Sequence, residues 1–173
     1  MRSSYPETRI VVSGRFWLLA ALALVLWPRP AAAEEPPTLP RGHVYLSEDF
    51  EGEAPGRPWG GTLRFADGYK SKRSLAIERV GEGSPSATVH IALPAAEMRG
   101  YRIQATAFVK AEGVSAKPNS WNGIKFMAAI EAPGGRQWPQ ADVGTGTFDW
   151  KRLAFSARIP PDATAVTLYL GLE

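Results

Sequence analysis

The feature that most constrains this chain is an alternation of apolar and polar residues with a period of two. Between Tyr101 and Lys110, the odd-numbered positions are apolar and the even-numbered positions are mostly polar. Successive side chains of a β-strand point to opposite faces, so this pattern indicates a strand with one buried face and one solvated face. Four further segments repeat it, with the apolar sets Val89, Ile91 and Leu93; Ile124, Phe126, Ala128 and Ile130; Leu153, Phe155, Ala157 and Ile159; and Val166, Leu168, Leu170 and Leu172. We expect all of these sets to face a common core.

Turn-forming residues separate these segments. They cluster at 81–85, 94, 113–118, 133–135, 144–146 and 160–162. Short strands with such punctuation are typical of an all-β sandwich or jelly roll. Residues 94–99 could form one helical turn, which we expect to be too short to matter. Because the sequence stops at Glu173 directly after a strong core strand, we expect a sandwich that lacks its last strand and exposes an open edge.

Residues 1–33 have the organisation of a signal peptide. Three arginines precede an uncharged apolar run from Phe16 to Trp27, and the small residues 31–33 suit a signal peptidase. We expect cleavage before Glu34 and a secreted or periplasmic bacterial protein. The alternative is an uncleaved membrane anchor, but the run has 12 residues, and a bilayer span needs about 20. The absence of cysteine excludes both lipid attachment at the cleavage site and disulfides in the fold.

The charge balance after cleavage argues against a nucleic-acid partner. The chain has 20 Lys+Arg and 17 Asp+Glu, and residues 1–33 contain four Arg and one Glu, which leaves 16 of each sign. Nucleic-acid-binding domains normally carry a clustered excess of Lys and Arg. We expect no membrane partner after cleavage. Residues 34–42 are rich in proline and predict an extended linker, so that the domain spans 43–173.

Six segments occur in an order that resembles a known family. They are EDFEG at 48–52, SLAIE at 74–78, YRIQATAFVKAEGV at 101–114, WNGIKFMAAI at 121–130, GTFDWKRLAFSARIPPDA at 146–163 and VTLYLGLE at 166–173. Over residues 43–173 the chain resembles the galactose-binding-like jelly-roll modules, in particular the carbohydrate-binding modules that precede the catalytic domain of cellulase-type bacterial glycoside hydrolases. The resemblance implies a jelly-roll β-sandwich, here without its last strand, that binds a plant or microbial polysaccharide and is fused to a catalytic domain.

A structural calcium ion is a further candidate. Calcium prefers oxygen ligands, and Glu48, Asp49 and Glu51 supply three carboxylates at the expected start of the first strand. The alternative is that these acids only solvate the strand start. Calcium sites of the resembled family also draw on the last strand, which this sequence does not contain.

Sugar binding requires exposed aromatic rings and planar polar side chains. Trp121 and Trp138 lie in turn-rich stretches and are the candidate platforms, with anchoring against the core as the alternative. Polar and aromatic residues that the alternation places on solvated strand faces could line a shallow groove with them; these are Arg102, Gln104, Thr106, Lys125 and Tyr169. The alternative for each is an ordinary wetted sheet face. We expect Trp150 to be structural, because alternation is interrupted there in the manner of a bulge.

The sequence contains no recognisable catalytic constellation. The acids Glu78, Glu131 and Asp142 lack the spacing of a glycosidase pair, and His43 and His90 have no companion motif. We therefore expect a non-catalytic binding module, although the full-length protein could be a glycoside hydrolase. The alternative is a cell-surface adhesion or protein-interaction β-sandwich without sugar affinity, because a fold does not determine its function.

Overall fold

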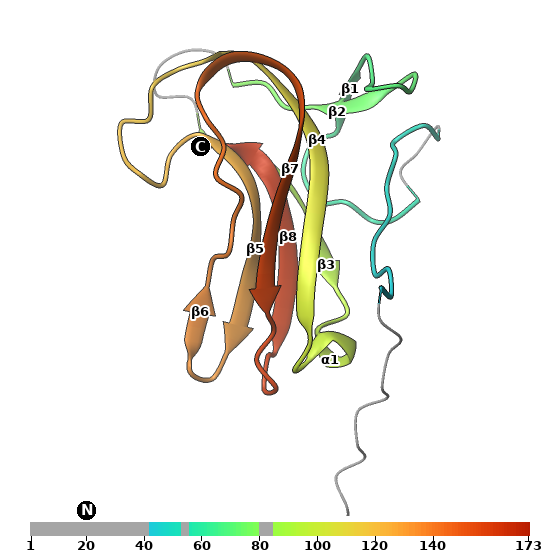
Figure 1. Ribbon diagram of the computed structural model, residues 1–173, viewed down its shortest axis with the longest axis vertical. Coiled ribbons are helices and arrows are strands. Elements are labelled where there is room, and N and C mark those ends of the chain that lie inside the picture. Colours follow the sequence, from blue (N-terminus) through green and yellow to red (C-terminus); the bar gives the residue numbers. More distant parts are fainter. Residues whose placement is uncertain (1–41, 53–55, 80–84) are drawn as a thin grey trace, which may run out of the picture. The chain divides into compact units, whose positions relative to one another are not determined.

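The computed structural model describes residues 42–52, 56–79 and 85–173 (Figure 1). The predicted signal peptide and nearly all of the predicted linker lie outside the described residues. Strands make up 49% of the described part, with almost no helix, which confirms the all-β prediction. The elements are β1 (Arg64–Ala66), β2 (Ser74–Ala76), β3 (Ala87–Leu93), α1 (Ala95–Met98), β4 (Arg102–Val114), β5 (Ile124–Ala132), β6 (Gly135–Gln137), β7 (Gly146–Arg158) and β8 (Ala165–Leu172). No helix among them is long and apolar enough to cross a membrane.

One antiparallel sheet has four strands in the order β3-β8-β5-β6. Strand β8 pairs along its length with β3 on one side and with β5 on the other. The open edge that we expected directly after the last strand of the sequence does not fall on β8, which is an internal strand; the missing further strand stays a prediction. The apolar residues Val166 and Leu168 of β8 are buried, and its backbone groups find partners on both sides.

The long strands β4 and β7 form a second antiparallel sheet, which lies in front of the first in Figure 1. Their register proceeds regularly from Arg102↔Arg158 to Val109↔Lys151 and then shifts before Ala111↔Phe148. This shift is a β-bulge, at which β7 contains one more residue than β4. The side chains of β7 beyond it therefore point to the opposite face relative to their partners on β4. The predicted interruption of alternation at Trp150 is therefore confirmed.

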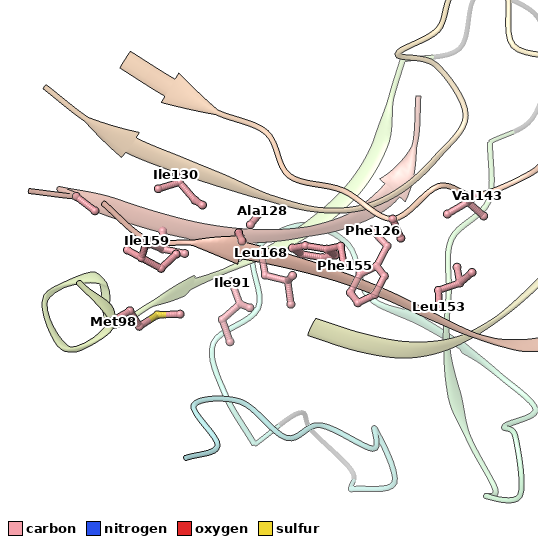
Figure 2. Close-up of a cluster of buried hydrophobic side chains, with 14 residues drawn as sticks. Ile91, Met98, Phe126, Ala128, Ile130, Val143, Leu153, Phe155, Ile159 and Leu168 are labelled. Carbon is pink, nitrogen blue, oxygen red and sulfur yellow. The ribbon is translucent and has the colours of Figure 1, made fainter. Parts of the chain in front are cut away.

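The core lies between these two sheets. Phe126 of β5 and Phe155 of β7 meet edge to face across it, with ring centroids 5.1 Å apart (Figure 2). The buried cluster consists of Ile91, Met98, Phe126, Ala128, Ile130, Ala141, Val143, Leu153, Phe155, Ala157, Ile159, Ala163, Val166 and Leu168. The predicted apolar sets of β3, β5, β7 and β8 all contribute to this cluster, and residues 103, 105, 107 and 109 of β4 pack against it. Two sheets facing one core give the fold a sandwich-like character.

Four short elements were not predicted, or were underestimated. The helical turn α1 was expected not to matter, but its Met98 is only 1% exposed and closes one end of the core. The two-residue turn at 133–134 leads into β6, which pairs with β5 from Ile130↔Gln137 to Ala132↔Gly135. Strands β1 and β2 form a separate antiparallel pair outside both large sheets.

Candidate functional site

The outer face of the four-stranded sheet collects several of the candidate binding residues. Because side chains alternate along a strand, residues next to the buried ones point outward. Register places Tyr169 of β8 between His90 of β3 and Met127 of β5. Isolated bridges extend this row with Gly60 beside His90 and Gln140 beside Met127. We call this outer surface, from Gly60 across to Gln140, the tryptophan face, because Trp138 also lies on it.

Trp138 belongs to the tryptophan face by register. The pairings Ile130↔Gln137 and Met127↔Gln140 have the same register, so Trp138 lies opposite Ala129. We expected Trp138 in a loop at a strand end; instead it lies beside the middle of β5, where Pro139 accepts a 2.9 Å hydrogen bond from the Ala128 amide. The Trp138 side chain is 49% exposed.

The Trp138 ring is supported on one side by a charged pair. The Arg136 guanidinium lies 5.2 Å from the ring centroid and also forms an ion pair with Glu131 on β5. A cation over an indole ring is attracted by its electron-rich face. The ring is therefore held at the edge of the sheet with part of its surface open to solvent.

Small residues form the floor beside Trp138. Ala129 is buried although it lies on the outer side of β5, and Thr167 of β8 is its cross-strand neighbour. Along β8, Gly171 is also buried, and an added Cβ there would contact Thr88. The face is thus low beside Trp138, at Ala129 and Thr167, and again at Gly171, and the Tyr169 side chain stands between these two parts.

His90 and Tyr169 form the polar part of this face. Their rings are 5.6 Å apart and tilted by 32°. A Cβ built at Gly60 would lie 2.6 Å from the imidazole Cε1, so only glycine lets the backbone approach His90 this closely. The sequence did not identify His90 or Gln140 as site residues. Alternation placed His90 on a polar strand face, but it does not show which other strands or segments lie beside that strand.

The predicted platform Trp121 is 61% exposed and lies in the loop that precedes β5. Its backbone carbonyl accepts a hydrogen bond from Lys125 Nζ. Lys125, only 7% exposed, also pairs with Glu173 at 2.7 Å. Lys125 was expected in an open groove; it instead ties the Trp121 loop to the end of the tryptophan face. The Trp121 backbone is therefore held at the end of the tryptophan face beside Lys125, which lies about 13 Å along β5 from Ala129, the neighbour of Trp138, since β-strands rise by about 3.3 Å per residue.

Arg102 and Gln104 do not join this face. Both lie on the outer side of β4, which pairs with β7 and not with the strands that carry Lys125 and Tyr169. The core separates the two outer faces. The structure therefore brings Tyr169, Trp121 and Trp138 to one sheet and leaves three candidates, Arg102, Gln104 and Thr106, on the opposite layer.

Two other tryptophans have structural contacts. Trp59 packs against the core, and its indole nitrogen donates a 3.4 Å hydrogen bond to Glu48 Oε2. Trp150 is partly buried and lies 5.8 Å from the ring of Tyr69. Neither indole is among the exposed large apolar side chains of the described residues.

The three candidate calcium ligands do not converge. Glu48 accepts hydrogen bonds from the Phe50 amide and from Trp59, Asp49 accepts one from the Glu51 amide, and Glu51 accepts a 2.8 Å bond from the Arg73 amide. The described residues contain no group of three or more acidic, His or Cys side chains placed to hold a metal ion. These carboxylates fit a role in fixing the chain before β1 better than a shared calcium site.

Some of the titratable groups outside the tryptophan face have local partners. Glu78 pairs with Arg64 at 3.3 Å, and His43 meets Tyr45 edge to face at 4.8 Å. Burial is the largest cause that raises the pKa of Tyr45, and the nearby Tyr101 and Glu97 raise it further. The Tyr45 hydroxyl donates a 3.1 Å hydrogen bond to the Glu97 carbonyl.

Comparisons of the chain with protein-family models, with curated proteins and with solved structures found no significant match.

Proposed function

We propose that this chain is a non-catalytic carbohydrate-binding module of the galactose-binding-like jelly-roll type, and that the tryptophan face is its polysaccharide site. The observation that carries the proposal is Trp138, which is half exposed beside a floor of small residues and a row of polar side chains. Sugar rings present apolar C–H faces bordered by hydroxyls, and this combination of an aromatic ring with nearby hydrogen-bonding groups suits them.

The polar side chains supply complementary hydrogen bonds. The Tyr169 hydroxyl can donate and accept, the Gln140 amide offers both functions in one plane, and the His90 imidazole offers one of each when neutral. All three lie in one cross-strand row of the tryptophan face. A sugar stacked on Trp138 would therefore have donors and acceptors beside its hydroxyl groups.

Trp121 would extend the site along a polysaccharide chain. It borders the end of the face where Lys125 holds its loop, and it is the most exposed of the tryptophans in the described part. Two aromatic contacts separated along the sheet suit a polymer better than a single sugar, because each adds binding to the same chain.

The same proposal predicts where the protein acts and what it is attached to. We propose that residues 1–33 direct the protein out of the cytoplasm, to a compartment in which polysaccharides are accessible. Attached to a glycoside hydrolase, such a module raises the local concentration of substrate without performing chemistry.

Affinity electrophoresis of the full chain against cellulose, xylan, mannan and β-glucan tests the proposal. We expect retardation by at least one of them and about tenfold weaker binding for Trp138→Ala, since a stacked aromatic contributes about 1.5 kcal/mol. Phe65→Ala is the control, because Phe65 is also an exposed aromatic residue, 37%, but lies on β1, outside both large sheets.

Circular dichroism should show that both variants remain folded. If the folded wild-type chain is retarded by none of the four glycans, the carbohydrate proposal fails, and the adhesion or protein-interaction function becomes the better explanation. Equal loss in Trp138→Ala and Phe65→Ala would refute the placement of the site on the tryptophan face.

A further inference from the structure

The outer side of the β4–β7 sheet is a second surface with a different character. Its members alternate with the core-facing residues of both strands; they are Arg102, Gln104, Thr106, Phe108 and Lys110 on β4, and Arg152, Ala154, Ser156 and Arg158 on β7. We call this set the basic face. It contains four cationic side chains and no acidic one, and all of its residues are exposed.

The arginines at one end of the basic face lie directly opposite each other. Arg102 pairs with Arg158 in the ladder. Like charges in such cross-strand positions are destabilising. Among the described residues neither arginine has an ion-pair partner, and the same holds for Arg152. Their charge is therefore available to an anion from outside the domain.

The other end of the basic face combines cations with aromatic rings. Phe108 lies opposite Arg152, and the Tyr69 ring stacks on Phe108 at 4.4 Å. Lys70 Nζ lies 5.2 Å from the centre of the Tyr69 ring, and Lys110 is the next outward residue on β4. This end offers an apolar surface beside positive charge.

The two charged ends are separated by an uncharged polar stretch. Gln104, Thr106 and Ser156 lie between Arg102 and Phe108. Six residues of β-strand span about 20 Å, which is long enough for several sugar units. A ligand that matches this pattern carries negative charges at intervals, with neutral hydrogen-bonding groups between them.

We propose that the basic face is a second polysaccharide site, specific for an acidic polysaccharide in which carboxylated sugars are separated by neutral ones. The proposal rests on the proposed carbohydrate-binding function for its ligand class but uses a different surface. Arginine suits this ligand because its planar guanidinium can hold a carboxylate through two parallel hydrogen bonds. Nucleic acid fits less well, because its phosphates follow at shorter intervals than the carboxylates of such a polysaccharide, and more of them would lie above the uncharged stretch without a cation.

The test measures binding of the full chain to hyaluronan, in which glucuronate alternates with a neutral sugar, by titration calorimetry or affinity electrophoresis. We expect Arg102→Gln combined with Arg158→Gln to weaken binding at least tenfold, because two charge-assisted contacts are lost. Retention should fall steeply as salt is raised. The control, Arg57→Gln combined with Lys117→Gln, removes the same charge outside the basic face and should keep wild-type affinity.

The outcomes separate this inference from the proposed function. Trp138→Ala should keep hyaluronan binding, and the arginine double variant should keep binding to a neutral glycan. Undiminished binding to carboxyl-reduced hyaluronan would overturn the proposal, and so would equal losses in the double variant and its control. Tighter binding to single-stranded DNA or to heparin than to hyaluronan would also overturn it, because the spacing argument would then be wrong. The double variant should melt no lower than wild type, since it relieves the Arg102–Arg158 repulsion.

Discussion

The edge-to-face contact between Phe126 and Phe155 provides a quantitative test of the packing of the two sheets. Replacement of either ring by alanine would cost about 3–5 kcal/mol, close to the whole stability of a small domain, so leucine is the better probe. We expect Phe126→Leu and Phe155→Leu each to lower the free energy of unfolding by about 1–2 kcal/mol. Because the rings touch at 5.1 Å, the double variant should lose roughly 0.5–1.5 kcal/mol less than the sum of the single losses.

Urea unfolding followed by tryptophan fluorescence gives these free energies, provided that the slope with urea stays constant. Phe108→Leu is the control, because Phe108 is half exposed on the outer side of β4 and should cost less than about 1 kcal/mol. Additivity of the two core substitutions would mean that the rings do not interact. The assignment of β5 and β7 to facing layers would then be refuted.

Three further outcomes follow from individual contacts. Glu173→Gln leaves the buried Lys125 ammonium without its counterion and should cost about 1–3 kcal/mol in urea unfolding, whereas Lys125→Met should change stability by less than about 1 kcal/mol. Gly60→Ala should displace the His90 ring, which the imidazole Cε1 proton resonance would report, and should cost less than about 1 kcal/mol, because the exposed ring can turn aside; an unchanged resonance would contradict the close approach. Burial raises the pKa of Tyr45 above 10.0, so the folded state favours the neutral phenol: stability should fall as pH rises from about 10 through that raised pKa, and Tyr45→Phe should lose this dependence.

Alternation was sufficient to predict the all-β class and most of the core. The predicted apolar sets of β3, β5, β7 and β8 contribute to the buried cluster, because burial on one face of a strand imposes a period of two on the sequence. The exposure of Trp121 and Trp138 was also foreseen from the turn residues around them. These are local properties, and a single segment is enough to reveal them.

The pairing of strands could not be predicted in the same way. Alternation shows which residues of a strand share a face, but it does not show which strand lies beside it. Arg102 and Tyr169 were therefore assigned to one groove, although they lie on opposite layers. For the same reason the row that joins His90 with Gln140 became visible only in the structure.

The central place of β8 also governs how the domain can assemble. Strands β3 and β5 are not hydrogen-bonded to each other; each needs β8 as its partner, and β8 follows every other described strand in the sequence. A growing chain thus holds β3 and β5 apart, with their edges uncovered, until residues 165–172 have been made. Such long-range pairing slows folding and prolongs the time during which strand edges can meet other chains. The four-stranded sheet therefore forms late and in a single step. In a chain that ends before Ala165, β3 and β5 would have no strand between them to join them into one sheet.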